Sequence, residues 1–132
     1  MSITIGKPEL EDIINHARKV FPCEACGLLA GRRGRVSKVY RLTNTERGAM
    51  RYAAPEKEQF EAARRIRADG DEMIGIYHSH PNVRPYPSSR DIEMALHPEC
   101  SYVIISLMKN MPEVRSFRIA GGLVEEEAVD AG

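Results

Sequence analysis

An apolar run that leads directly into two histidines constrains the fold of this chain more than any other feature. Residues 73–77 are apolar at both alternating positions, and His78-Ser79-His80-Pro81 follows without a break. A strand that is apolar on both faces must be covered on both faces. We therefore expect a central strand in a sheet with helices on either side, and two histidines where that strand ends.

The rest of the chain alternates between helical and strand patterns. Apolar spacing predicts a first helix over 8–20 with Pro8 at its start. A second helix is expected from Pro55 to Gly70, with Phe60, Ala63 and Ile66 facing inward, and a short third helix over 88–96. The other expected strands are 27–30 and 36–42, which form a hairpin, and then 50–53, 101–107, 114–120 and 123–129. One α/β domain over residues 1–132, with a mixed, curved sheet flanked by helices, accounts for this pattern.

Composition argues against several classes of partner. Lys and Arg number 19, Asp and Glu number 19, and the formal net charge is zero, so nothing indicates nucleic-acid binding. No apolar run approaches the ~20 residues that cross a membrane, and the N-terminus lacks the pattern of a secretory signal. Three cysteines, an odd number, fit a reducing compartment better than a disulfide framework. We therefore expect a cytoplasmic protein without a nucleic-acid or membrane partner.

Two histidines and an aspartate have the spacing of a metal site. Successive strand residues point to opposite faces, so His78 and His80 project to the same side, roughly 6.5 Å apart along the strand. Asp91 falls in the first turn of the helix that begins at Ser88, from which its carboxylate can reach back over the strand end. Three protein ligands and a water are the usual arrangement of a catalytic zinc site. The sequence therefore predicts that His78, His80 and Asp91 bind one divalent ion in a metal hydrolase.

Ser88 and Asp91 also have a purely structural interpretation. Ser88-x-x-Asp91 fits a capping box, with Ser88 as the N-cap and Asp91 at the third helical position. That interpretation needs no metal, but it leaves two histidines on the inward side of an apolar strand. Burying an unpaired imidazole costs on the order of 1–3 kcal/mol, and one metal ion satisfies both rings. We therefore prefer the metal site, and treat His16 and His97 as ordinary core or surface residues.

A metal hydrolase also needs a base, and Glu24 is the candidate. It lies in the loop between the first helix and the first strand of the hairpin, and such a loop can approach the end of a neighbouring central strand. Considered alone, Glu24 would be a solvated loop residue.

The pair Cys23-x-x-Cys26 in the same loop invites a redox or structural-zinc interpretation. No second cysteine pair completes a four-sulfur site, and a thioredoxin-like pair opens a helix rather than precedes a strand. We expect Cys26 to pack as a small buried hydrophobe and Cys23 to face solvent or the cleft.

Taken together, these positions resemble the JAMM, or MPN-plus, metalloproteases, and in particular their compact prokaryotic branch. The family motif is an upstream glutamate, then H-x-H, seven residues, a serine, two residues and an aspartate. The matching residues, without departure in the local spacing, are Glu24, His78, His80, Ser88 and Asp91. The resemblance extends along nearly the full chain. It implies a layered fold like that of cytidine deaminases and one Zn²⁺ per chain on the three ligands.

The resemblance also implies an activity and a partner. Prokaryotic relatives of this size hydrolyse the peptide or isopeptide bond after the C-terminal Gly-Gly of a ubiquitin-like sulfur-carrier protein, and they release amino acids such as cysteine. Glu24 would then be the general base, and Ser88 would hydrogen-bond the oxyanion of the tetrahedral intermediate. The alternative is a non-catalytic binding module for a ubiquitin-like partner, because many relatives of this fold have lost metal ligands; this chain retains them all.

Overall fold

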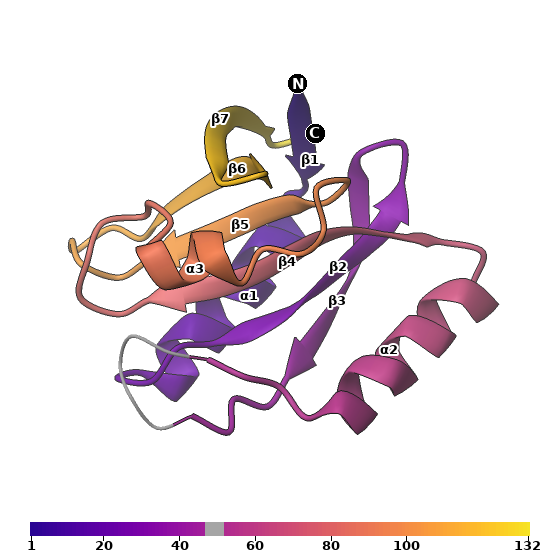
Figure 1. Cartoon of the computed structure of the whole chain (residues 1–132), viewed down its shortest axis with the longest axis horizontal. Coiled ribbons are helices and arrows are strands. Elements are labelled where there is room, and N and C mark those ends of the chain that lie inside the picture. The colour runs from indigo at the N-terminus through magenta and orange to yellow at the C-terminus, as the bar shows by residue number, and fades with distance from the viewer. Residues whose placement is uncertain (47–51) are drawn as a thin grey trace.

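The predicted central strand organises the sheet. The computed structural model describes residues 1–46 and 52–132 (Figure 1). Strand β4 (Glu72–His80) lies between β2 (Cys26–Arg32), to which it is antiparallel, and β5 (Ser101–Ser106), to which it is parallel. Because β4 and β5 are parallel, their carboxyl ends meet at one edge of the sheet. His80 is the last residue of β4 and therefore lies at that edge.

The sheet curves until it closes on itself. Four further strands are found in the described residues: β1 (Ser2–Ile5), β3 (Arg35–Leu42), β6 (Glu113–Ala120) and β7 (Leu123–Asp130). The hydrogen-bonded order is β1-β3-β2-β4-β5-β6-β7. Strand β1 closes the barrel because it pairs with both β3 and β7, in each case in the parallel direction. The mixed, curved sheet is therefore confirmed. The sequence does not predict β1, because four residues are too few to display a strand periodicity.

Helix α1 covers one face of the sheet. It spans Lys7–Val20, close to the predicted 8–20, and buries Ile13 and Ala17. These side chains join a cluster whose sheet residues include Leu29, Tyr77 and Val103. Gly27 of β2 lies beside Tyr77, and a Cβ at this glycine would overlap the tyrosine ring.

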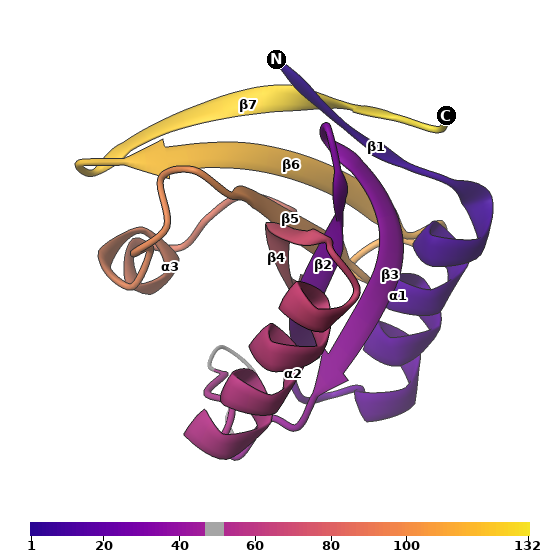
Figure 2. The same cartoon turned by 90° about the vertical axis from the view of Figure 1, so that its right-hand side faces the viewer.

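Helices α2 and α3 cover the other face. Helix α2 (Glu56–Ala68) buries Ala62 and Ile66 against a second apolar cluster that contains Leu28. Helix α3 (Ser89–Glu93) follows the loop after β4, and Ile92 packs against a third cluster that contains Ile104. Figure 2 shows α1 and α2 on opposite sides of β2 and β3. The expected layering, with helices on both faces, is confirmed, and no helix of the described residues is long and apolar enough to cross a membrane.

Three details of the prediction are wrong or untested. Phe60 does not face inward: its side chain is 66% exposed, because the buried stripe of α2 runs through Ala62 and Ile66 instead. Helix α3 ends at Glu93 rather than at residue 96. Of the strand expected over 50–53, residues 50 and 51 lie outside the described residues, and 52 and 53 are not part of a strand.

Candidate metal centre

The alternation of β4 separates two kinds of buried side chain. Tyr77 belongs to the cluster beneath α1, whereas Ile76 packs with the clusters on the side of α2 and α3. His78 and His80 follow the parity of Ile76, so they project toward α2 and α3. Both histidines are 1% exposed. The strand therefore delivers two imidazoles to one buried place between the sheet and these helices.

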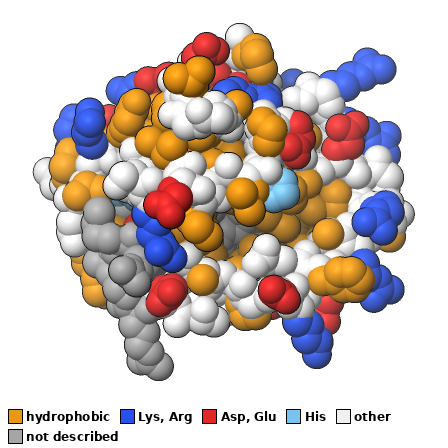
Figure 3. Space-filling model, in the orientation of Figure 1, with side chains coloured by type: hydrophobic (Ala, Val, Ile, Leu, Met, Phe, Trp, Pro, Cys, Tyr) orange, Lys and Arg blue, Asp and Glu red, His pale blue; other side chains and the backbone are white. Residues whose placement is uncertain are grey.

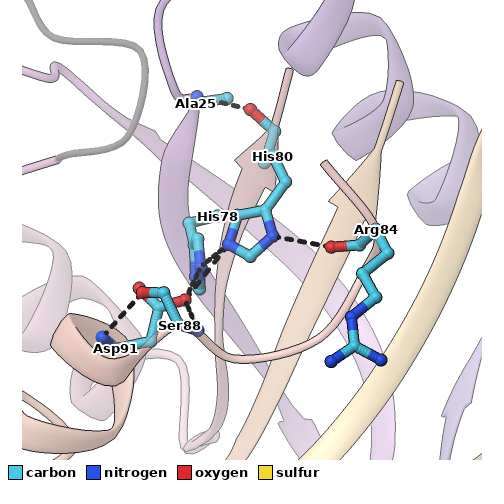
Figure 4. A network of polar contacts seen from close by, with 7 residues as sticks. Ala25, His78, His80, Arg84, Ser88 and Asp91 are labelled. Carbon is cyan, nitrogen blue, oxygen red and sulfur yellow. Dashed lines mark hydrogen bonds and ion pairs between the residues drawn. The ribbon is translucent and has the colours of Figure 1, made fainter. Parts of the chain in front are cut away.

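Three ligand atoms converge at that place (Figure 4). The Nε2 atoms of His78 and His80 are 3.2 Å apart, and they lie 3.0 and 3.1 Å from Oδ2 of Asp91. Tetrahedral coordination with bonds of about 2.1 Å places ligand atoms roughly 3.4 Å apart. The three atoms therefore need to separate by only a few tenths of an ångström to hold one ion of that size, and they are the one such group in the described residues.

The N-terminus of α3 aims the carboxylate. Ser88 Oγ accepts a hydrogen bond from the Asp91 N–H at 3.1 Å, and the Ser88 N–H donates to Asp91 Oδ2 at 2.9 Å. The predicted capping box is thus confirmed, and Oδ2 is the same atom that faces the histidines. Burial alone would raise the pKa of Asp91, but hydrogen bonds from His78 and His80 outweigh it and hold the pKa well below its usual range. The carboxylate is therefore ionised. The capping and metal interpretations do not compete.

The two imidazoles are oriented in different ways. His80 Nδ1 lies 2.9 Å from the carbonyl oxygen of Arg84, so the Nδ1–H donates to this carbonyl and Nε2 is turned toward Asp91. His78 Nδ1 is buried without a hydrogen-bond partner in the described residues, and its ring stacks on Tyr52. Burial lowers the pKa of His78. For His80 burial also lowers the pKa, but Asp91 and Arg84 raise it by more.

Glu24 is buried beside these residues. Its side chain is 1% exposed, and Oε1 has no hydrogen-bond partner in the part of the chain that the structure describes. Burial raises the pKa of Glu24 to about 8, and the charges of His80 and Asp91 also act on this carboxyl group. The structure therefore brings Glu24 to the cluster, instead of leaving it as a solvated loop residue.

Two polar side chains hold the loop of Glu24 in place. Ser79, between the two histidines, accepts a hydrogen bond from the Ala25 N–H on its Oγ at 2.7 Å, and its own N–H donates to the Ala25 carbonyl at 3.0 Å. Asn44 Nδ2 donates to the Glu24 carbonyl at 2.9 Å. The glutamate is thereby attached to the same strand that carries the histidines.

Comparison with known proteins identifies the family. A family model described as prokaryotic homologs of the JAB domain, Prok-JAB, matches residues 6–120. The chain belongs to the Prok-JAB family. The predicted resemblance to the JAMM and MPN-plus proteins is confirmed at this level.

Relatives of this Prok-JAB chain match over most of its length. A CysO-cysteine peptidase from Mycobacterium tuberculosis is 39% identical over 127 residues, covering 90% of this chain and 86% of that protein. A desampylase from Haloferax volcanii is 33% identical over 111 residues, covering 79% of this chain and 80% of that protein. The solution structure of a Desulfitobacterium hafniense protein superposes with a TM-score of 0.88 at 38% identity, covering 98% of this chain and 91% of that one.

The sequence interpretation misses three residues around the centre of this Prok-JAB domain: Asn44, Tyr52 and Ser79. The burial of Ser79 could have been predicted, because strand alternation places a serine between two histidines on the opposite face, inside the core. Nothing in the sequence marks Asn44 or Tyr52, whose positions depend on tertiary contacts of the segment before α2.

The cysteines carry no redox pair. No disulfide joins the three cysteines; Cys26 and Cys100 are buried, whereas Cys23 is half-buried. Burial raises the pKa of the Cys26 thiol to about 12, so this thiol is not a reactive thiolate near neutral pH. The expected packing of Cys26 is confirmed.

Proposed function

We propose that this protein is a zinc-dependent metallopeptidase that cleaves the bond after the C-terminal Gly-Gly of a ubiquitin-like sulfur-carrier protein. One observation carries the proposal: three ligand atoms lie within 3.2 Å of one another, beside a buried glutamate with a free carboxylate oxygen. The names of the curated relatives, a peptidase and a desampylase, support a hydrolytic function.

The donor set supports zinc as the metal. Two imidazole nitrogens and one carboxylate oxygen make a common three-ligand set for catalytic zinc, and the spacing of the donor atoms fits its bond lengths. Zinc held in this way would supply the Lewis acidity that makes water a nucleophile at neutral pH. His78, His80 and Asp91 would hold it, and the Ser88 N–H and the Arg84 carbonyl would orient two of these ligands.

Glu24 would move the proton. The general base of a hydrolase works best when its pKa lies near the operating pH, and burial places the pKa of Glu24 at about 8. A nearby cation favours the ionised form of a carboxyl group, so a loaded site would lower this pKa toward neutrality. Glu24 would accept a proton from the attacking water and return it to the leaving amine. Its unpaired Oε1 is the atom proposed for this transfer.

Ser88 would stabilise the oxyanion. Its Oγ accepts a hydrogen bond from the Asp91 N–H, which leaves the hydroxyl hydrogen to donate elsewhere. A donor of this kind, directed at the oxygen on which negative charge develops, contributes roughly 10²–10³ in rate. Ser88 would therefore cap α3 and take part in catalysis at the same time.

The surface around the site supports a protein partner with a slender tail. Exposed apolar side chains lie on or next to the two helices of this face: Phe60 on α2, and Met94 and Leu96 just after α3. Figure 3 shows apolar side chains across the middle of this face, with Lys and Arg mainly near its outline. Only glycine lets a backbone pass close to a buried centre without a side chain in the way, which suits a Gly-Gly end. We also propose a cytoplasmic location, because the three cysteines form no disulfide.

The test is hydrolysis by the zinc-loaded protein. The substrate is a ubiquitin-like carrier that ends in Gly-Gly and is joined through a peptide bond to cysteine; a second adduct carries the same tail on a lysine side chain. We expect mass spectrometry to show release after Gly-Gly, dependence on zinc, and no cleavage of a matched Ala-Ala adduct. Binding of zinc and adduct without any cleavage would contradict the enzymatic proposal and favour the non-catalytic binding module.

A further inference from the structure

One of the two histidines of the centre lacks the support that metal-binding histidines normally have. Such residues almost always donate their second ring N–H to a carboxylate, a carbonyl or water, and this bond fixes the ring. His80 follows the rule through the Arg84 carbonyl, at 2.9 Å. His78 does not: within the described residues its Nδ1 is buried without a partner. Within the described residues, the His78 ring therefore has no hydrogen bond on its Nδ1 side.

The ring of Tyr52 is in the right place to do so. The centroids of the Tyr52 and His78 rings are 4.8 Å apart, and their planes differ by 21°, which is a stacked arrangement. Such pairs are stabilising beyond the burial of their surfaces. The His78 ring also contacts the His80 ring, with 5.0 Å between the centroids and an angle of 58° between the planes. A rotation of the His78 imidazole about its bond to Cβ would break the stacking with Tyr52 and turn Nε2 away from Asp91.

Tyr52 itself is held by the core. It packs against the cluster that contains Leu28, Ala62 and Ile66, beneath α2. A ring anchored in the core in this way can keep the stacked imidazole in one orientation.

We propose that Tyr52 is a positioning residue of the metal centre, whose ring holds the His78 imidazole in its ligating orientation in place of the missing hydrogen bond. This role rests on the proposed function only in requiring that the site bind a metal ion; it does not depend on the substrate. It joins the segment before α2 to the metal centre through an aromatic contact.

The experiment compares three substitutions of Tyr52 with a matched control. Tyr52→Phe keeps the ring, whereas Tyr52→Leu and Tyr52→Met remove it and retain bulk. The control is Tyr40→Leu, because Tyr40 packs partly buried against the same apolar cluster. The zinc dissociation constant is measured by competition with a chromophoric chelator, the visible spectrum is recorded with Co²⁺ as a probe, and thermal unfolding monitors the fold.

We expect Tyr52→Phe to bind zinc within about twofold of the wild type, and Tyr52→Leu and Tyr52→Met to bind it about 10- to 100-fold more weakly with an altered Co²⁺ spectrum. Tyr40→Leu should lower the unfolding temperature and leave affinity and spectrum unchanged. If either ring-deleted variant folds and matches the wild type in both readouts, the role of Tyr52 is overturned. Equal weakening in Tyr52→Phe, or in Tyr40→Leu, would overturn it as well. A wild-type protein that binds no zinc would instead overturn the proposed metal site, and this role with it.

Discussion

The two faces of β4 differ in how completely the buried polar atoms beside them are hydrogen-bonded. On the side of α1, the Tyr77 hydroxyl lies 2.6 Å from Nδ1 of His16, and Ser79 Oγ accepts the Ala25 N–H. On the side of α2 and α3, His78 Nδ1 and Glu24 Oε1 are buried without partners in the described residues. Adjacent positions of one strand thus serve two purposes.

This difference distinguishes residues that stabilise the fold from residues that belong to the metal site. A buried polar group without a partner costs about 1–3 kcal/mol, so a stable protein keeps one only where something else requires it. The hydrogen-bonded groups beneath α1 hold elements together. The unpaired groups beneath α2 and α3 lie around three converging ligand atoms. Substitutions on the side of α2 and α3 should therefore reduce function, whereas substitutions on the side of α1 should reduce stability.

The largest effect is expected from His80→Ala, compared with His16→Ala. Both histidines are buried, but on opposite faces of the sheet. His80→Ala removes one of three ligands, so zinc binding and hydrolysis should both fall below detection. His16→Ala should leave one zinc per chain and destabilise the fold by about 1–3 kcal/mol, because the Tyr77 hydroxyl loses its partner. Elemental analysis and chemical unfolding measure the two outcomes; equal zinc loss in both variants would erase the distinction between the faces.

Glu24→Gln should separate metal binding from catalysis. The amide has the shape of the carboxyl group but does not accept the proton, so we expect one zinc per chain and a rate lowered by about 10²–10⁴. The control is Glu9→Gln, a substitution in the first turn of α1 that should change neither property. Steady-state hydrolysis with zinc analysis measures both. Near-normal turnover by Glu24→Gln would remove Glu24 from the role of base.

Ser88→Ala should have a smaller effect on rate and a second effect on stability. Loss of the proposed oxyanion donor should lower the rate about 10²–10³-fold, and loss of the helix cap should lower stability by about 1 kcal/mol. Its exposed neighbour offers a control, since Ser89→Ala should change neither quantity appreciably. A stability loss without a change in rate would show that Ser88 acts as a cap alone.

Ser79→Ala tests the face beneath α1 next to the site. The substitution leaves the buried Ala25 N–H without its partner, so we expect a loss of about 1–3 kcal/mol in the free energy of unfolding and one zinc per chain as in the wild type. Ser37→Ala, on the exposed side of β3, is the comparison and should be nearly neutral. Loss of zinc from a folded Ser79→Ala protein would contradict the assignment of this serine to the fold.

The last effect concerns pH and His16, and it vanishes near neutral pH. Burial, followed by the charge of Arg41, lowers the pKa of His16 from 6.5 to about 4. Between these two pH values the unfolded chain binds a proton on His16 that the folded protein does not bind. The free energy of unfolding therefore rises with pH through this window, and the loss of stability caused by His16 is complete below pH 4. His16 should contribute up to about 1.4 kcal/mol per pH unit to the slope of the free energy of unfolding against pH, and His16→Gln should remove this contribution. Urea unfolding of both metal-free proteins from pH 4 to 7 measures it; identical slopes would contradict the pKa shift.

Local patterns in the sequence predict the parts of the molecule whose periodicity is strong. The apolar alternation before His78 predicts the central strand, and the same alternation places both histidines on one side. The spacing from Ser88 to Asp91 predicts the capping box, which aims the carboxylate. These features depend on contacts within a few residues, where strand and helix geometry leave little choice.

Features set by tertiary contacts are not visible in the sequence. Phe60 has helical spacing for burial but lies exposed, because the packing of α2 on the sheet selects the stripe through Ala62 and Ile66. The burial of Glu24 depends on hydrogen bonds from a distant asparagine and to a distant serine. The stacking of Tyr52 on His78 joins segments 26 residues apart. No local rule specifies such contacts.

The most direct measurement is the anomalous diffraction of a crystal soaked in zinc, collected on both sides of the zinc absorption edge. We predict one zinc peak per chain, with bonds of about 2.0–2.2 Å to Nε2 of His78, Nε2 of His80 and a carboxylate oxygen of Asp91. A peak bound by other residues, or none at this place in a zinc-saturated crystal, would contradict the claim that these three side chains share a cation.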